Sequence, residues 1–319
     1  MTLVTFGEAS LHLAAPDRER LVTADGLRVH VDGAESNAAV AAARLGVESV
    51  WLSKLPDSPL GRRIAGTLRG HGLDADVVWA DGGERQGVRY FERGSDPRPD
   101  VTVDDAAGAA VTRLAPEDLS VDRLRGAGAF YTTAATMALS RDLVRTCATL
   151  LATASNAGVR TAFGLGPRGR WSPEAARETV RDLFSDVDVL VARESDVRAV
   201  LGRDGTAREL AHALATAHDF ERVALTRGDR GGVLWEDATC HQRAATETRV
   251  VDPTGAADAF AGVVLARTMA GAGAAETLAD AVAAETLART VPGPLSTATA
   301  ADIAEVVARM DDERDRRSQ

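Results

Sequence analysis

From Asp118 onward, the chain alternates short runs of β-branched and apolar residues with longer helix-favouring stretches. The pattern predicts strands at 129–133, 159–163, 187–191, 222–226 and 232–235, and helices at 141–156 and 173–184. Strands separated by helices of about ten to fifteen residues indicate right-handed crossovers and a mostly parallel sheet. The sequence therefore predicts an α/β fold with a central, mostly parallel sheet flanked by helices. In an open sheet of this kind, ligands bind beyond the carboxyl ends of the strands.

The chain before Asp118 extends this pattern. It predicts strands at 3–8 and 47–52, and helices at 38–45 and 62–70. Segments 21–31 and 87–93 are more polar, as expected for strands exposed on one face, so they predict a small second sheet. The rest of 75–105 is interpreted as turn-rich, and the charged tail 311–319 as frayed.

Composition limits the classes of function. The chain has 319 residues, 45% of them apolar, and can form one large domain with a sizeable core. A net charge of −10 argues against nucleic acid as a partner. Cys147 and Cys240 have no paired spacing, so neither a disulfide framework nor a zinc site is indicated. No segment approaches the roughly eighteen apolar residues of a membrane span, so we expect a cytoplasmic protein with no membrane partner.

The stretch 250–262 carries the strongest functional signal. It pairs a turn at 252–255 with an uninterrupted helix-favouring run at 256–269. The first N–H groups of a helix lack internal partners, and the helix dipole adds about half a positive charge, so an anion such as phosphate fits there. The carboxylate of Asp258 would repel that anion. Its presence at this place is explained if Asp258 accepts the proton of a hydroxyl that attacks the phosphate. The alternative is that Asp258 only compensates the helix dipole.

This stretch resembles the second signature of the ribokinase-like (PfkB) carbohydrate kinases, Asp-Thr-x-Gly-Ala-Gly-Asp-x-Phe. Pro253 stands in place of the usual Thr, and Ala257 in place of the third Gly. The resemblance implies that Asp258 is the catalytic base. It also implies that the N–H groups of Ala256, Ala257 and Asp258, which follow the turn at Gly255, neutralise charge on the transferred phosphoryl group. The implied cofactors are ATP and Mg²⁺, and a potassium ion near the turn is left open.

The amino-terminal part resembles the other signature of the same family. Gly33, Asn37, Asp57 and Gly61 fall on its positions, although each alone would be an ordinary turn or cap residue. The resemblance implies that Gly33 lets a sugar approach the backbone and that Asn37 binds the sugar. It further implies a single kinase domain over 1–319, with segments of about 10–32 and 85–105 forming a β-sheet lid. This lid would cover the sugar, offer Tyr90 as a contact, and mediate a homodimer.

A glycine-rich loop at 226–232 resembles the strand-end loop that holds ATP phosphates in the family. Thr226, Gly228 and Gly231 match it, and Thr254 of the second signature is assigned to the nucleotide with them. The alternative for the loop is a simple hairpin turn.

Within the family, the chain is most similar to the 2-keto-3-deoxygluconate kinases, especially those of haloarchaea. Segments 5–9, 29–37, 54–63 and 171–174 carry this likeness, which covers nearly the whole chain. Where those kinases have Asp-x-Asn-x-Arg, this chain has Gly164, Gly166 and Arg168. An arginine there would clamp a substrate carboxylate with two hydrogen bonds, and the alternative is a lone surface arginine.

Two further places depart from the resembled kinases. Their Asn-x-x-Glu motif appears here as Arg193-Glu194-Ser195-Asp196. Glu194 and Asp196 remain candidate metal residues that act through water, whereas Arg193 would contact phosphate directly or repel magnesium. In the second lid strand, the tyrosine and arginine of the acid-sugar kinases are replaced by Val103 and Asp105.

The sequence therefore predicts an ATP-dependent kinase that phosphorylates a primary hydroxyl of a sugar or sugar acid. The leading acceptor is 2-keto-3-deoxygluconate, or 2-keto-3-deoxygalactonate, converted to its 6-phosphate. One alternative is a kinase for fructose, ribose or a nucleoside. The other is a degenerate, non-catalytic sugar- or nucleotide-binding protein, suggested by Ala257, Gly164, Gly166 and Arg193 together.

Overall fold

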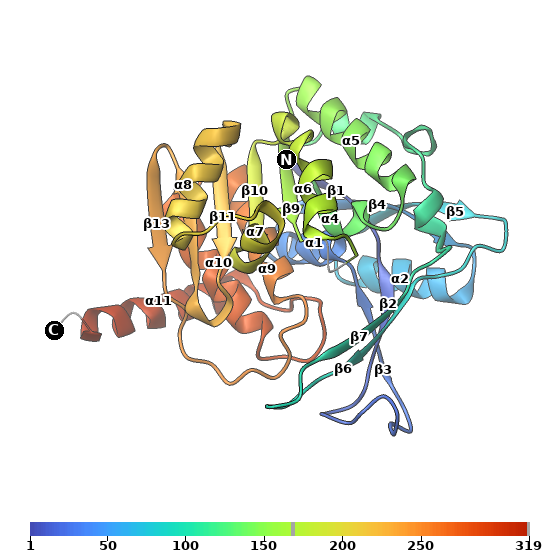
Figure 1. Cartoon of the computed structure of the whole chain (residues 1–319), viewed down its shortest axis with the longest axis horizontal. Helices are drawn as coiled ribbons and strands as arrows, with labels where there is room; N and C mark the ends of the chain where they lie inside the picture. The colour runs from blue at the N-terminus through green and yellow to red at the C-terminus, as the bar shows by residue number, and fades with distance from the viewer. Residues whose placement is uncertain (167–169, 318–319) are drawn as a thin grey trace.

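The large sheet organises the chain in this computed structural model, which describes residues 1–166 and 170–317. Its strands follow the order β13-β12-β11-β10-β9-β8-β1-β4-β5 (Figure 1). Their bounds are β1 (Thr2–Phe6), β4 (Glu48–Pro56), β5 (Asp74–Ala80), β8 (Ala129–Thr133), β9 (Arg160–Leu165), β10 (Val189–Arg193), β11 (Arg222–Thr226), β12 (Gly232–Glu236) and β13 (Thr239–Arg243). All neighbouring pairs are parallel except β11 with β12 and β12 with β13.

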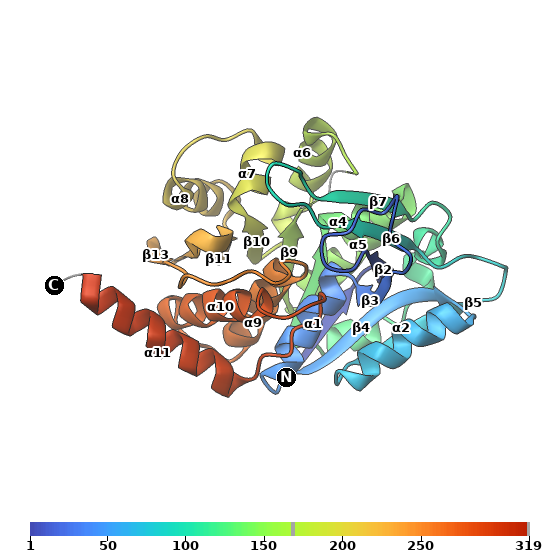
Figure 2. The same ribbon diagram turned by 90° about the horizontal axis from the view of Figure 1, so that it is seen from below.

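Helices cover both faces of this sheet because side chains of a buried strand alternate between its two faces. One face packs on α1 (Ala34–Arg44), α9 (Ala256–Met269), α10 (Ala274–Ala288) and α11 (Ala300–Arg317). The other packs on α5 (Arg141–Asn156), α6 (Pro173–Arg181), α7 (Glu194–Leu201) and α8 (Ala207–His218) (Figure 2). Along β1, Leu3 joins the first core and Val4 and Phe6 join the second. The predicted α/β fold is confirmed.

Smaller elements complete the chain. The remaining α-helices are α2 (Pro59–Gly70), α3 (Asp122–Arg125) and α4 (Ala134–Met137). Short 3-10 turns occur at Ala110–Arg113, Pro116–Asp118, Phe184–Asp186 and Gly228–Arg230. Within the described ranges, no helix is both long enough and apolar enough to cross a bilayer.

A second, four-stranded sheet projects away from the large one (Figure 1). Its order is β3 (Arg28–Asp32), β2 (Ser10–Ala14), β6 (Val88–Glu92) and β7 (Val101–Asp105), and all four strands fall inside the two segments expected to form a lid. Leu11 and Val31 lie on one face of this sheet and pack into a hydrophobic core that also contains residues of α2 and β5. We call this sheet the lid sheet.

Several elements differ from their predicted extents. Helix α1 begins at Ala34 rather than at 38, because the Gly33 carbonyl already accepts the Asn37 N–H at 2.8 Å. Strands β2 and β5 were missed, since Asp74 and Asp76 conceal the apolar alternation of β5. The prediction that the tail frays is wrong for residues 311–317: α11 continues to Arg317, and Arg243 holds it through an ion pair with Asp311 at 2.8 Å.

Helices α1 and α9 cross unusually closely. A Cβ atom added to Gly262 of α9 would lie 2.2 Å from the Ala38 carbonyl oxygen and 2.7 Å from the Ala41 Cβ. Only glycine allows this approach, and the approach brings the beginnings of both helices together. Asn37 and Asp258 therefore become neighbours although they are far apart in the sequence.

Candidate active site

The start of α9 forms a tight backbone turn. Gly255 precedes the helix with φ 75°, and a Cβ there would lie 2.0 Å from the Pro294 carbonyl oxygen, so the position requires glycine. The Ala256 N–H already donates to the Pro253 carbonyl at 3.2 Å. Ala257 and Asp258 follow as the second and third helical residues, whose N–H groups no residue of the helix can bond. The Ala256 N–H is thus already used within the turn, and the role of the N–H groups of Ala257 and Asp258 toward an anion stays a prediction.

Asp252 fixes the shape of this turn. One of its carboxylate oxygens accepts the Thr254 N–H at 3.0 Å, and the other accepts the Gly293 N–H at 2.9 Å. The backbone of Thr254, which was predicted to bind nucleotide, is therefore part of the turn's own hydrogen bonding. Its side chain does not line either of the cavities described below.

Asn37 orients the Asp258 carboxylate. Its Nδ2 lies 2.8 Å from Asp258 Oδ2 and 2.8 Å from Asp32 Oδ1, so its two amide protons are shared between two carboxylates. Its Oδ1 accepts the Gly33 N–H at 3.4 Å. The structure thus brings together Gly33, Asn37 and Asp258 as predicted sites, but it uses the Asn37 side chain to hold Asp258 in place.

Arg89 of the lid sheet reaches this cluster, and sequence reasoning missed it. Its Nη1 lies 2.9 Å from Asp32 Oδ2 and its Nε lies 2.6 Å from Asp104 Oδ1, and the side chain is buried. Tyr90 was predicted to contact the sugar, but it occupies the next position of β6 and is paired with Leu13 and Val103. Because strand side chains alternate, Tyr90 points to the face of the lid sheet opposite to Arg89, and its contact with a sugar stays a prediction.

Two carboxylates of the motif segments lie at the surface, away from the cluster. Asp57 forms an exposed ion pair with Arg62 at 2.7 Å, and Asp105 pairs with Arg85 at the surface. The predicted carboxylate clamp, Arg168, lies outside the described residues. Arg170 lies near the cluster, 3.6 Å from Glu8 and 3.5 Å from Asp104.

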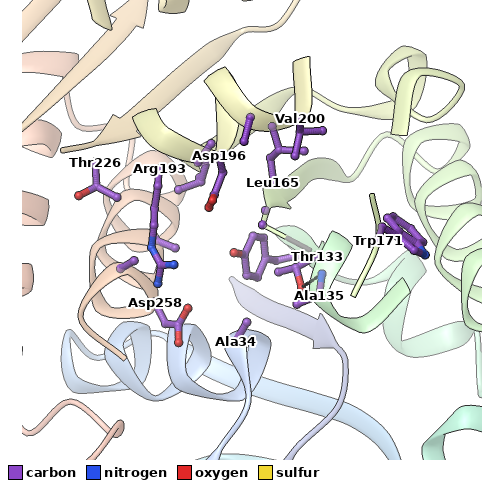
Figure 3. A pocket seen from close by; sticks show the side chains of 18 of the residues that line it. Ala34, Thr133, Ala135, Leu165, Trp171, Arg193, Asp196, Val200, Thr226 and Asp258 are labelled. Atoms are coloured by element: carbon purple, nitrogen blue, oxygen red, sulfur yellow. Dashed lines mark hydrogen bonds between the residues drawn. The ribbon is translucent and has the colours of Figure 1, made fainter. Parts of the chain in front are cut away.

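A cavity of about 340 Å³ opens beside Asp258, beyond the carboxyl ends of β8 to β11. Figure 3 shows Asp258 and Arg193 at one end and Trp171 at the other. Gly164 and Gly166 line it, and their missing side chains shape it: a Cβ on Gly164 would lie 2.5 Å from the Tyr131 hydroxyl oxygen. The aromatic ring of Tyr131 therefore fills space that a larger residue at 164 would need. We call this the acceptor cavity.

A second cavity, of about 270 Å³, lies on the other side of the α9 start. Thr226 and Gly228, two of the predicted nucleotide residues, line it, together with four arginines at 193, 227, 230 and 289. Gly231 does not line it; its φ of 83° and its close approach to the Arg243 carbonyl give it a structural role instead. Clustered guanidinium groups favour a phosphate-bearing ligand. We call this the arginine cavity; the Thr-Arg-Gly-Asp-Arg run at 226–230 was its signal in the sequence.

The two candidate metal residues fit a magnesium ion poorly. Glu194 is contacted by Arg198 at 2.8 Å, Arg227 at 3.2 Å and Arg230 at 3.0 Å. Burial raises its pKa, but the hydrogen bonds and charges of these arginines outweigh burial and lower the pKa below its ordinary value. Asp196 lines the acceptor cavity, where burial raises its pKa. No group of three His, Cys, Asp or Glu residues within 1–166 and 170–317 is arranged to hold a metal.

Glu285 on α10 gives the arginine cavity a pH-dependent charge. It accepts a hydrogen bond from the Thr226 hydroxyl at 2.5 Å and one from Arg289 at 3.2 Å. Burial nevertheless raises its pKa to about 7 from an ordinary value of 4.5. Because the folded state holds this proton more tightly than the unfolded state, the contribution of Glu285 to stability falls as pH rises from about 4.5 to about 7.

We expect Glu285→Gln to remove that loss. The free energy of unfolding of the variant, minus that of the wild type, should increase by about 3 kcal/mol between roughly pH 4.5 and pH 8. Urea unfolding at a series of pH values measures this difference, and Glu276→Gln, an exposed change on the same helix, serves as the matched control. A difference that stays constant across this range would show that Glu285 is ionised throughout.

Comparisons with known proteins agree with this geometry. A family model described as pfkB family carbohydrate kinase matches residues 2–300. The chain is 47% identical to the 2-dehydro-3-deoxygalactonokinase of Haloferax volcanii over 96% of each chain. It is 30% identical to the 2-dehydro-3-deoxygluconokinase of Thermoproteus tenax, over 83% of this chain and 81% of that one. The solved 2-dehydro-3-deoxygluconokinase of Thermotoga maritima matches with a TM-score of 0.92 at 30% identity, covering 97% and 98% of the two chains. The chain therefore belongs to the pfkB family of carbohydrate kinases.

Proposed function

We propose that this chain is an ATP-dependent kinase that phosphorylates the terminal hydroxyl of 2-keto-3-deoxygalactonate or 2-keto-3-deoxygluconate. The observation that carries the proposal is the position of Asp258 at the start of α9. There the acceptor cavity meets the arginine cavity, and Ala257 lines both. The activities named for the Haloferax volcanii and Thermoproteus tenax relatives support this choice of acceptor.

In the proposed reaction, the acceptor hydroxyl attacks the γ-phosphorus of ATP in line with the bond to ADP. Asp258 takes the hydroxyl proton, and Asn37 holds its carboxylate toward the cavity. The N–H groups of Ala257 and Asp258 face the charge that grows on the phosphoryl oxygens. The arginine cavity binds the remaining phosphates of the nucleotide.

Magnesium enters this proposal only as part of the bound nucleotide. Mg²⁺ commonly keeps several waters and is held by one or two carboxylates together with substrate phosphates. Glu194 is occupied by three arginines and Asp196 lines the acceptor side, so neither fits as a direct ligand. When bound, the ion would neutralise phosphate charge.

An acid sugar as acceptor is supported by the cations near the acceptor cavity. Gly166 and Arg170 border residues 167–169, which the structure does not describe. Gly166 lines the acceptor cavity, and Arg170 reaches Glu8 and Asp104. Arg89 and Arg170 are both engaged by carboxylates. We propose Arg168, the carboxylate clamp predicted from the sequence, as the residue that binds the substrate carboxylate.

An acceptor panel tests the proposal. We expect ADP release, measured in a coupled assay, with the two keto-deoxy acids and at least about 100-fold less with fructose, ribose or adenosine. Arg168→Ala should lower kcat/KM for the acids by about 10- to 100-fold, as expected for the loss of charge-assisted hydrogen bonds. Arg123→Ala, which removes a surface partner of Asp74, is the control.

The outcomes of this panel are distinct. Turnover with a neutral acceptor alone would retain the kinase and reject Arg168 as the clamp. Binding of ATP without turnover of any acceptor would identify a non-catalytic binding protein.

The lid sheet supports a further proposal about assembly. Val29, Val101 and Val103 are exposed, and the strand register places them on the same face as Tyr90. We propose that two copies of the chain associate through this face. Cytoplasmic localisation and a potassium ion near Asp252 stay predictions of the sequence.

A further inference from the structure

Arg193 differs from the other cations of the arginine cavity because no carboxylate within 1–166 and 170–317 forms an ion pair with it. Arg227 and Arg230 are paired with Glu194, and Arg289 is paired with Glu285. Arg193 is exposed at the end of β10, and its guanidinium group makes no hydrogen bond or ion pair with another residue in the described part of the chain. Its positive charge is thus available to a ligand.

The position of Arg193 also distinguishes it from Arg227, Arg230 and Arg289. It lines both the acceptor cavity and the arginine cavity, as do Thr226 and Ala257. Figure 3 shows its side chain extending from the strand end toward Asp258, at the same end of the acceptor cavity. A group that passes from the arginine cavity to the acceptor must move between Arg193 and the start of α9.

Resting on the proposed function, we propose that Arg193 is a catalytic residue that contacts the phosphoryl group during its transfer. In that step, a bond forms between the acceptor oxygen and the γ-phosphorus. The bond from the γ-phosphorus to the β–γ bridging oxygen breaks, and its electron pair leaves with ADP. The acceptor proton passes to Asp258.

The electrostatics of the site favour this role. Charge spreads over the phosphoryl oxygens in the transition state, and a guanidinium group offers several donors in one plane to such oxygens. Ala257 at the start of α9 and Arg193 at the end of β10 both line the two cavities, so a phosphoryl group that passes from one cavity to the other meets both residues. Glu194, the residue that follows Arg193, is already held by three other arginines, and no carboxylate of the described residues forms an ion pair with Arg193.

Two variants of Arg193 test the proposal. Arg193→Met keeps the length of the side chain without its charge, and Arg193→Lys keeps the charge without the planar donors. We expect Arg193→Met to lower kcat by about 100- to 1,000-fold, while the Kd of ADP, measured by calorimetry, changes less than about threefold. Arg193→Lys should recover part of this loss. Arg203→Met, on the loop after α7, is the control and should leave kcat within about threefold.

A second measurement separates a transition-state role from simple nucleotide binding. Tetrafluoroaluminate with ADP and the acceptor mimics the transferring phosphoryl group, and the Kd of this complex should weaken in Arg193→Met by the same factor as kcat. The proposal is wrong if kcat of Arg193→Met stays within about threefold of the wild type. It is equally wrong if the affinity for ADP falls as much as kcat. If the proposed function is wrong, the wild type itself will show no turnover with any acceptor. The proposed role of Arg193 would then be rejected together with the proposed function.

Discussion

Replacing Asp258 with asparagine is expected to lower kcat by a factor of about 1,000 while the fold stays intact, since general-base catalysis commonly contributes about 100- to 10,000-fold. Asparagine matches aspartate in size, and its amide oxygen can still accept the hydrogen bond that Asn37 donates at 2.8 Å. An amide cannot take the proton of an attacking hydroxyl. The variant should therefore bind ADP at least as tightly as the wild type, because a negative charge beside the phosphates is removed.

The control for this variant is Asp302→Asn. Asp302 also lies in the first turn of a helix, α11, where it accepts the N–H and hydroxyl hydrogen bonds of Thr299. If Asp258 only compensates a helix dipole, the two substitutions should have similar small effects on stability and none on turnover. Steady-state kinetics with the best acceptor and calorimetry with ADP decide between these outcomes. Turnover of Asp258→Asn within about tenfold of the wild type would remove Asp258 from the role of base.

The second large effect concerns stability and follows from the close crossing of α1 and α9. We expect Gly262→Ala to lower the free energy of unfolding by about 3 kcal/mol, the upper end for overpacking, because the obstacle is backbone. The added methyl would lie 2.2 Å from the Ala38 carbonyl oxygen, and this oxygen cannot move without moving α1. Turnover should fall as well, since Asn37 lies on the displaced helix and orients Asp258.

Gly66→Ala is the matched comparison. Gly66 also lies inside a helix, α2, but it is exposed and a Cβ there would meet nothing within 4 Å. Alanine should stabilise this position by up to about 1 kcal/mol, because it reduces the backbone freedom of the unfolded chain. Chemical denaturation of both variants measures the contrast. Equal effects of the two substitutions would mean that the helices separate easily at Gly262.

The sequence predicted best where local signals and burial agree. The bounds of β8, β11, α5 and α9 were predicted without error, because strands rich in buried apolar and β-branched residues and long helical runs leave little choice of structure. Helix α11 was misjudged at its end, since two of its acidic residues, Asp311 and Glu313, are held by Arg243 of β13 and by Thr246 of the loop after β13. Such partners become visible only when the chain has folded.

The candidate site shows the same division. Gly33, Asn37 and Asp258 were predicted because each belongs to a motif of fixed spacing. Arg89 was missed because the sequence does not show which of two neighbouring strand residues faces the cluster, and a shift of one residue along a strand exchanges its two faces. The arginine cavity was predicted only in part, since its cations come from the ends of β10 and α10 and from the loop after β11, which the sheet topology brings together.

The amide of Asn37, which is held by two carboxylates at once, has a consequence for how binding begins. Asp32 is fixed from the lid sheet by Arg89, and Asp258 is fixed through the same amide, so the direction of the base is set before any acceptor arrives. A site arranged in this way needs no rearrangement of its base at the moment of reaction. An incoming acceptor therefore loses only its own rotational and translational freedom when it binds. Selection among acceptors then depends on how well each one places its hydroxyl beside a carboxylate that does not move to meet it.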